Sequence, residues 1–64
     1  MAYKDEWKVY YGWLEWLRQD GRTNMFGATP YLAQAFPDLA DPQAVVVSWM
    51  ENYSALVEDG VCVQ

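Results

Sequence analysis

Histidine is absent from this sequence, and Cys62 is the only cysteine. With one thiol and no imidazole, the chain cannot assemble a tetrahedral zinc site, so we expect no bound metal. A lone cysteine cannot form an internal disulfide, so nothing indicates an oxidising compartment. General acid–base catalysis near neutral pH usually needs a histidine or a perturbed carboxylate in a cleft. We therefore expect no enzymatic activity, no catalytic residue and no cofactor.

Basic residues are missing from the second half of the chain. All four of them, Lys4, Lys8, Arg18 and Arg22, lie in the first 22 positions, where four acidic residues balance them. The stretch 33–64 carries five acidic residues and no basic one, and this accounts for the net charge of -5. A surface of this kind repels phosphate, so we expect no nucleic-acid partner. It favours a protein partner with a basic surface.

Long apolar runs are also absent, and none approaches the ~20 residues that span a bilayer. The first residues lack the apolar core of a signal peptide. We therefore expect no membrane contact and a cytoplasmic protein. The length of 64 residues is that of one small domain, covering 1–64.

Helical periodicity is the main structural signal. Apolar residues recur at steps of three and four over a predicted helix at about 4–19, which Gly21 ends. This predicted seam contains Tyr3, Trp7, Tyr10, Leu14 and Leu17.

Two further helices have start signals that contain proline. Thr29-Pro30 predicts the start of a helix at 30–36, which Pro37 ends. Asp41-Pro42 predicts the start of a helix at 42–57, with Gly60 beyond its end. The sequence thus predicts an all-α, compact three-helix domain. The predicted core residues are Leu14, Leu32, Phe36, Val46, Met50 and Tyr53.

Aromatic residues are in excess for such a small interior, at 17% of the chain. Each aromatic side chain brings about 150–250 Å² of surface, so some must lie half exposed. Those outside the predicted seam either fill the space between helices or form a docking surface. The candidate partner-binding residues are Trp13, Trp16, Tyr11, Met25, Phe26 and Trp49.

The spacing of the second and third helices also fits a helix-turn-helix DNA-binding motif. Its recognition helix would carry Gln43, Ser48, Glu51 and Asn52, with no Lys or Arg. Because a DNA reader must first neutralise phosphates, DNA binding is the weaker interpretation.

Two resemblances add to this interpretation. The stretch 21–32, with Trp49-Met50 downstream, resembles small proteins of tailed bacteriophages that share the pattern Gly-x-Thr-Asn-Met-Phe-Gly-Ala-x-Pro-Tyr-Leu. This resemblance covers residues 21–50 and implies a phage origin. More loosely, Met25-Phe26-Gly27 is similar to the Met-Gly-Phe loop of ubiquitin-associated three-helix domains, with the order changed. That resemblance implies a compact architecture whose central loop can act as a docking surface.

The function predicted from the sequence is therefore binding. We expect a small acidic module, encoded by a phage and working in the host cytoplasm, that docks on a host or phage protein and inhibits or redirects it. A structural subunit of a homo-oligomer and a helix-turn-helix DNA-binding protein are the alternatives.

Overall fold

The structure is a computed structural model that describes residues 3–21 and 23–62. Helices make up its regular structure, and no strand occurs in these two ranges. In chain order the elements are the 3-10 turn η1 (Asp5–Trp7), α1 (Lys8–Asp20), the 3-10 turn η2 (Met25–Gly27), α2 (Ala28–Ala35), α3 (Pro42–Glu51) and α4 (Tyr53–Glu58). The all-α prediction is confirmed at this level.

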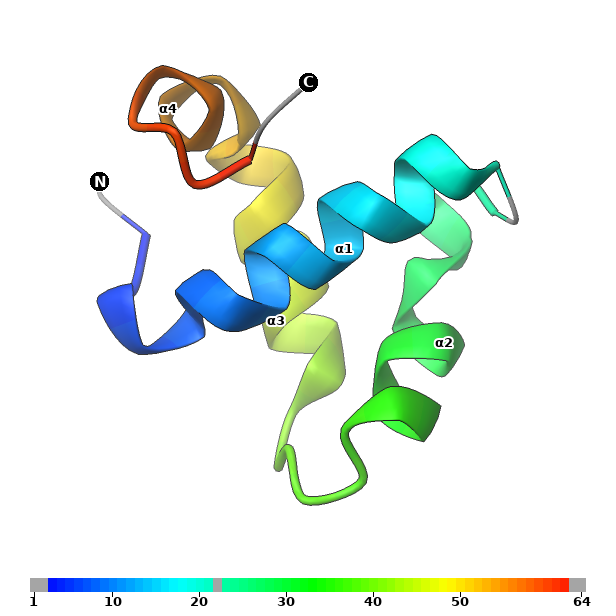
Figure 1. The fold of residues 1–64 in the computed structure, drawn as a ribbon. Coiled ribbons are helices and arrows are strands. Elements are labelled where there is room, and N and C mark those ends of the chain that lie inside the picture. The colour runs from blue at the N-terminus through cyan, green and yellow to red at the C-terminus, as the bar shows by residue number, and fades with distance from the viewer. Residues whose placement is uncertain (1–2, 22, 63–64) are drawn as a thin grey trace.

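Three helices pack against one another. Helix α1 contacts both α2 and α3, which also contact each other (Figure 1). The radius of gyration is 10.6 Å, close to the value of about 11 Å expected for a compact chain of this length. No helix in the described part of the chain is long and apolar enough to cross a membrane.

The predicted boundaries hold best where a cap fixes them. Gly21, with a φ of 81°, closes α1 and donates its N–H to the Arg18 carbonyl. The Asp41 carboxylate accepts a hydrogen bond from the Ala44 N–H at 3.1 Å, as an N-cap does. The predicted start at Thr29-Pro30 is wrong, because α2 begins at Ala28. Its entry is organised instead by Asn24, whose side chain accepts from the Gly27 N–H at 3.0 Å.

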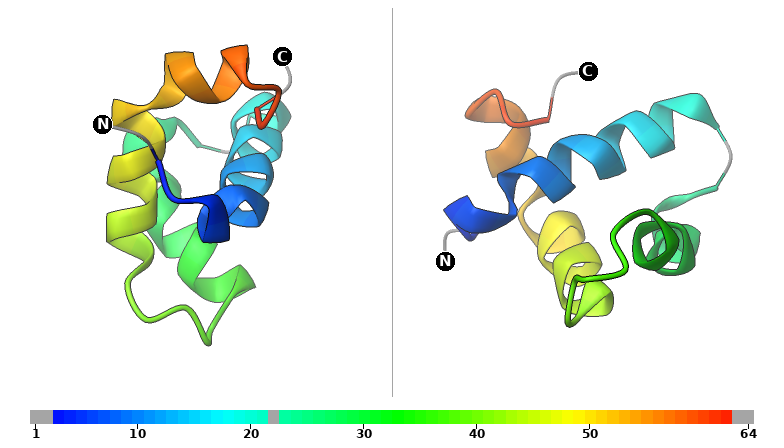
Figure 2. Two further views of the ribbon diagram at one scale, coloured as in Figure 1. Left: turned by 90° about the vertical axis from the view of Figure 1, so that its left-hand side faces the viewer. Right: turned by 60° about the horizontal axis from the view of Figure 1, so that its bottom comes forward.

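The predicted helix at 42–57 is interrupted at Asn52. This residue has φ -111° and ψ 15°, outside helical geometry. The Ser48 carbonyl accepts hydrogen bonds from both the backbone N–H and the side-chain amide of Asn52, each at 2.9 Å. Beyond it, α4 runs at a steep angle to α3 (Figure 2). The turn brings Leu56 into the core, where it is buried.

The core is built mainly from α1, α2 and α3. Of the six predicted core residues, Leu14, Leu32 and Val46 are buried, whereas Phe36, Met50 and Tyr53 are half-buried and packed against the core. The buried apolar side chains of α1 are Tyr11, Leu14 and Leu17. Because the Tyr11 hydroxyl finds a polar partner in Ser48, at 2.8 Å, Tyr11 takes the inner position predicted for Tyr10.

We expect Leu14→Ala to destabilise the domain by about 2–5 kcal/mol, because the leucine has no exposed surface and its loss leaves a cavity. A domain of this size has roughly 3–5 kcal/mol of stability, so most of the variant should be unfolded at 37 °C. Thermal unfolding followed by circular dichroism measures this. Val9→Ala, at an exposed position of the same helix, is the control and should change stability little. A Leu14→Ala melting curve that matches the wild type would contradict the burial of this face of α1.

Candidate functional site

Helix α1 has an apolar face that the other described residues cover only in part. Val9, Gly12, Trp13 and Trp16 follow one another at steps of three, one and three, so they lie on one side of the helix, opposite the Tyr11 side. We call these four residues the α1 outer face. Val9 is 70% exposed and Trp16 is 52% exposed. They lie two helical turns apart, with Gly12 and the half-buried Trp13 between them, and an apolar face that is partly exposed over this length is typical of an interaction site.

Aromatic packing holds the two tryptophans of this face in position. The Trp13 ring meets Phe36, just beyond α2, edge-on at a centroid distance of 5.6 Å. Phe36 is packed in turn against Tyr10 at 5.0 Å. Trp16 lies 6.0 Å from Trp13. Trp16 is therefore presented to solvent beside an ordered aromatic cluster, which lowers the entropy cost of using it as an anchor.

A groove of about 310 Å³ runs along the α1 outer face beside Trp16. Its lining residues are Gly12, Glu15, Trp16, Gln19 and Val61. The glycine keeps the groove open between α1 and the C-terminal segment. Among the described residues, a methyl group placed on Gly12 would meet the Val61 carbonyl oxygen, at 3.8 Å.

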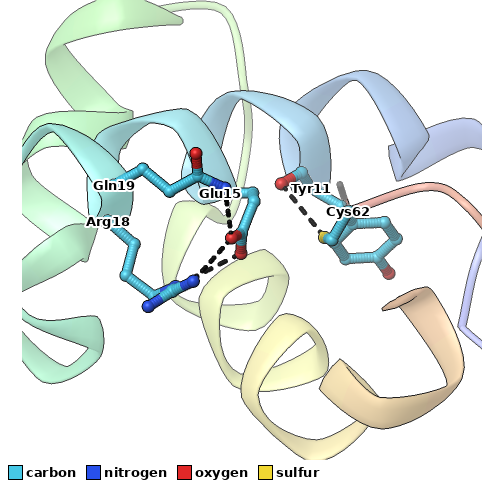
Figure 3. Close-up of polar contacts among 5 residues, drawn as sticks. All are labelled: Tyr11, Glu15, Arg18, Gln19 and Cys62. Carbon is cyan, nitrogen blue, oxygen red and sulfur yellow. Dashed lines mark hydrogen bonds and ion pairs between the residues drawn. The ribbon is translucent and has the colours of Figure 1, made fainter. Parts of the chain in front are cut away.

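The polar side of this groove is electrically balanced. Glu15 is buried, and Arg18 donates to its two carboxylate oxygens at 3.3 and 2.7 Å (Figure 3). Gln19 donates a further hydrogen bond at 2.8 Å. Burial raises the pKa of Glu15, but the hydrogen bonds from Arg18, Gln19 and Tyr53 outweigh burial and hold this pKa below its ordinary value. The Glu15 carboxylate therefore stays ionised and well partnered at neutral pH.

The cysteine behaves as a core residue. The Cys62 thiol is buried and donates to the Tyr11 carbonyl at 3.6 Å (Figure 3). Burial raises its pKa, and the nearby Trp49 indole lowers that pKa by a smaller amount. Because the thiolate is the reactive form, a buried thiol with a raised pKa is a poor nucleophile.

The structure separates the predicted partner-binding residues into three groups. Trp16 and Phe26 are exposed, and Phe26 is the more so, at 85%. Trp13 and Met25 are half-buried against the core. Tyr11 and Trp49 are fully buried, so their assignment to a docking surface is wrong.

Each of the two buried aromatics has a physical reason for its place. Tyr11 satisfies its hydroxyl on Ser48, and Trp49 stacks edge-on with Tyr53 at 6.1 Å. Sequence reasoning also missed Val9 as a surface residue. Its position four residues before Trp13 and seven before Trp16 could have placed it on the same face.

Helix α3 presents a different, acidic surface. A shallow depression of about 370 Å³ there is lined by Asp41, Gln43, Ala44, Val47, Ser48 and Glu51. Two of these residues are carboxylates and none is basic. The Lys and Arg residues that the structure describes lie elsewhere: Lys4 over the Trp7 ring, Lys8 beside Asp5, and Arg18 beside Glu15; Arg22 lies outside the described ranges. The helix that would read DNA therefore offers repulsion to phosphate.

Comparison with known proteins finds no matching family model, no similar curated protein and no similar solved structure. Function must therefore be inferred from the chain's own geometry and chemistry.

The Glu15 cluster gives the domain a predicted sensitivity to acid. Because the folded-state pKa of Glu15 is lowered, its stabilising effect is present above the ordinary value of 4.5 and is lost as the pH falls through the lower folded value. We expect Glu15→Gln to be less stable by about 1–3 kcal/mol at pH 7, since it loses charge-assisted hydrogen bonds. The difference in unfolding free energy between this variant and the wild type should become smaller below about pH 4.5.

Thermal unfolding measured by circular dichroism between pH 3 and pH 7 tests this expectation. Glu58→Gln makes the same change at an exposed position and serves as the control. If Glu15→Gln loses as much stability in acid as the wild type does, the Glu15 cluster is not the source of the acid sensitivity.

Proposed function

We propose that this chain is a small acidic protein-binding module that docks its α1 outer face on a basic surface of another protein. The observation that carries the proposal is the exposure of Val9 and Trp16, two turns apart on the same face of a helix whose opposite side is packed. Tryptophan in such a setting is among the residues that most often dominate binding energy. The motif at 21–32 supports a phage-encoded protein whose partner is a host or phage protein.

A module of this kind works by occupying a surface. No chemistry is required of it, because covering a functional patch of a larger protein is enough to inhibit or redirect that protein. The acidic second half would attract a basic partner from a distance, whereas the α1 outer face would supply the short-range contact. The all-helical fold is compatible with the predicted three-helix module. The packing of α1 against α2 and α3 supports the α1 outer face.

One observation favours a second candidate, a homo-oligomer. The first 22 residues carry four basic and four acidic residues, so two copies meeting through α1 would not repel each other there. An interface between identical chains also requires one patch that fits itself. The molar mass of the purified protein in solution, measured across concentrations, separates this candidate from the first.

We expect Trp16→Ala to leave the domain folded and to weaken partner binding by at least about 30-fold, or about 2 kcal/mol, as for a typical interface hot spot. The wild type is first used as bait in host-cell lysate, and the captured protein is identified and purified. Its affinity for the wild type and the variant is then measured by isothermal titration calorimetry.

Phe26→Ala is the matched control for this measurement, because it also removes an exposed aromatic ring but from η2. It should bind as the wild type does. If Phe26→Ala abolishes binding and Trp16→Ala does not, the working surface is the central loop. If Trp16→Ala unfolds the domain, the ring is part of the core and the proposed face does not exist.

A further inference from the structure

Phe26 has the most exposed large apolar side chain in the described part of the chain, at 85%. The proposed function does not use it, because docking is assigned there to the α1 outer face. Phe26 lies in η2, which runs directly into α2, four residues before Pro30 and five before Tyr31. Tyr31 is exposed as well, at 39%. Aromatic rings that reach this far into water are typical of a contact surface.

A hollow of about 380 Å³ lies on α2, in the same continuous helical stretch as Phe26. Pro30, Tyr31 and Gln34 line it, and we call these three residues together with Phe26 the α2 patch. The patch therefore carries a projecting ring and a recess within nine consecutive residues. An interface between two identical copies about a two-fold axis needs both parts on one surface, because the same patch meets itself.

The α2 patch is also the part of the chain without charge. Residues 23–37 contain no charged residue, although the chain as a whole has a net charge of -5. Arg22, which lies outside the described ranges, and Asp38 flank this stretch. Two copies that met through α3 or α4 would bring carboxylates such as Glu51 and Glu58 together, and like charges oppose association. The α2 patch offers no carboxylate to a basic partner, but it can meet a second copy without this repulsion.

The polar groups of the patch are suited to an identical surface as well. The Tyr31 hydroxyl and the Gln34 amide each contain both a donor and an acceptor of hydrogen bonds. Such groups can pair with the same groups of another copy, whereas two carboxylates or two ammonium groups cannot.

We propose that two copies of this chain associate through the α2 patch about a two-fold axis, with the Phe26 ring of each copy seated in the hollow of the other. This inference is independent of the proposed function, because it does not use the α1 outer face. The patch contains few residues, and small interfaces are typical of weak, transient complexes. We therefore expect a reversible dimer with a Kd of roughly 0.1–1 mM.

Sedimentation equilibrium at protein concentrations from about 0.02 to 2 mM brackets this Kd. In two-dimensional NMR of the ¹⁵N-labelled protein, dilution should shift the amides of Phe26, Tyr31 and Gln34 and leave those of Val9 and Trp16 unchanged. Added NaCl should leave the Kd unchanged or lower it, because salt screens the repulsion between two chains of charge -5 and the patch has no ion pair to weaken.

Two variants test the patch itself. Phe26→Ala removes the projecting ring and should raise the dimer Kd at least about ten-fold. Gln34→Glu places a carboxylate inside the interface and should raise the Kd at least about five-fold. Gln43→Glu is the matched control, because it makes the same change in net charge at an exposed position of α3 and should change the Kd far less. All three side chains are exposed, so the variants should melt as the wild type does in circular dichroism.

A wild type that stays monomeric at about 2 mM overturns the proposal. An unchanged Kd in Phe26→Ala overturns it too, as does equal weakening by Gln34→Glu and Gln43→Glu. A dimer that Trp16→Ala abolishes and Phe26→Ala does not meets through the α1 outer face, which contradicts the proposal and favours the second candidate function. If the wild type is monomeric and Phe26→Ala loses the captured partner, that partner occupies the α2 patch in place of a second copy. The effect of Trp16→Ala on the captured partner tests the proposed function separately from all of these outcomes.

Discussion

The position of Tyr11 determines how the rest of the molecule is assembled. Its hydroxyl lies 2.8 Å from the Ser48 hydroxyl on α3 and accepts the Lys4 N–H at 3.3 Å. Its backbone carbonyl accepts the Cys62 thiol. The rings of Tyr3 and Trp7 meet the Tyr11 ring edge-on at 5.8 and 6.5 Å. One fully buried side chain of α1 thus joins the N-terminal segment, α3 and the C-terminal segment.

This arrangement explains why the opposite side of α1 is left open. Both ends of the described chain are drawn toward the Tyr11 side, where Tyr3 also donates a hydrogen bond to Asp59 at 2.5 Å. Of the described residues, Phe36 and the Val61 segment reach the flanks of the outer face. Among the described residues, Tyr3 and Cys62 are thus attached on the Tyr11 side, and Trp16 stays exposed on the other.

Local signals predicted much of this fold, and tertiary contacts decided the rest. Gly21 and Asp41 act through their own backbone or their nearest neighbours, so their roles could be read from the sequence. The inward turn of Tyr11 depends on Ser48, which is 37 positions away. The change of backbone geometry at Asn52, with its side chain bonded to Ser48, is not revealed by a sequence that reads as helix on both sides. Periodicity alone cannot supply either contact.

For the candidate surface, too, local sequence signals predicted one part and tertiary contacts decided the other. Periodicity placed Trp13 and Trp16 outside the predicted core seam, and the structure leaves Trp16 exposed on that side of α1. Periodicity could not show that Trp49 is buried or that a methyl group would fit on Gly12. Both facts depend on α4 and the C-terminal segment. Burial of an aromatic side chain is decided by what the fold places over it, and in a small domain a single short element such as α4 is enough to change the outcome.

Charge and apolar contact are placed on different parts of this molecule, with physical consequences for binding. The described cations lie beside Trp7, Asp5 and Glu15, so they do not neutralise the carboxylates of α3 and α4. The long-range field is therefore negative and acts mainly on the rate of encounter, weakening as salt screens it. The α1 outer face has little charge of its own, and contacts made there would set how long a complex lasts. In the proposed docking, different residues would therefore set affinity and association rate, Trp16 the first and Glu51 or Glu58 the second.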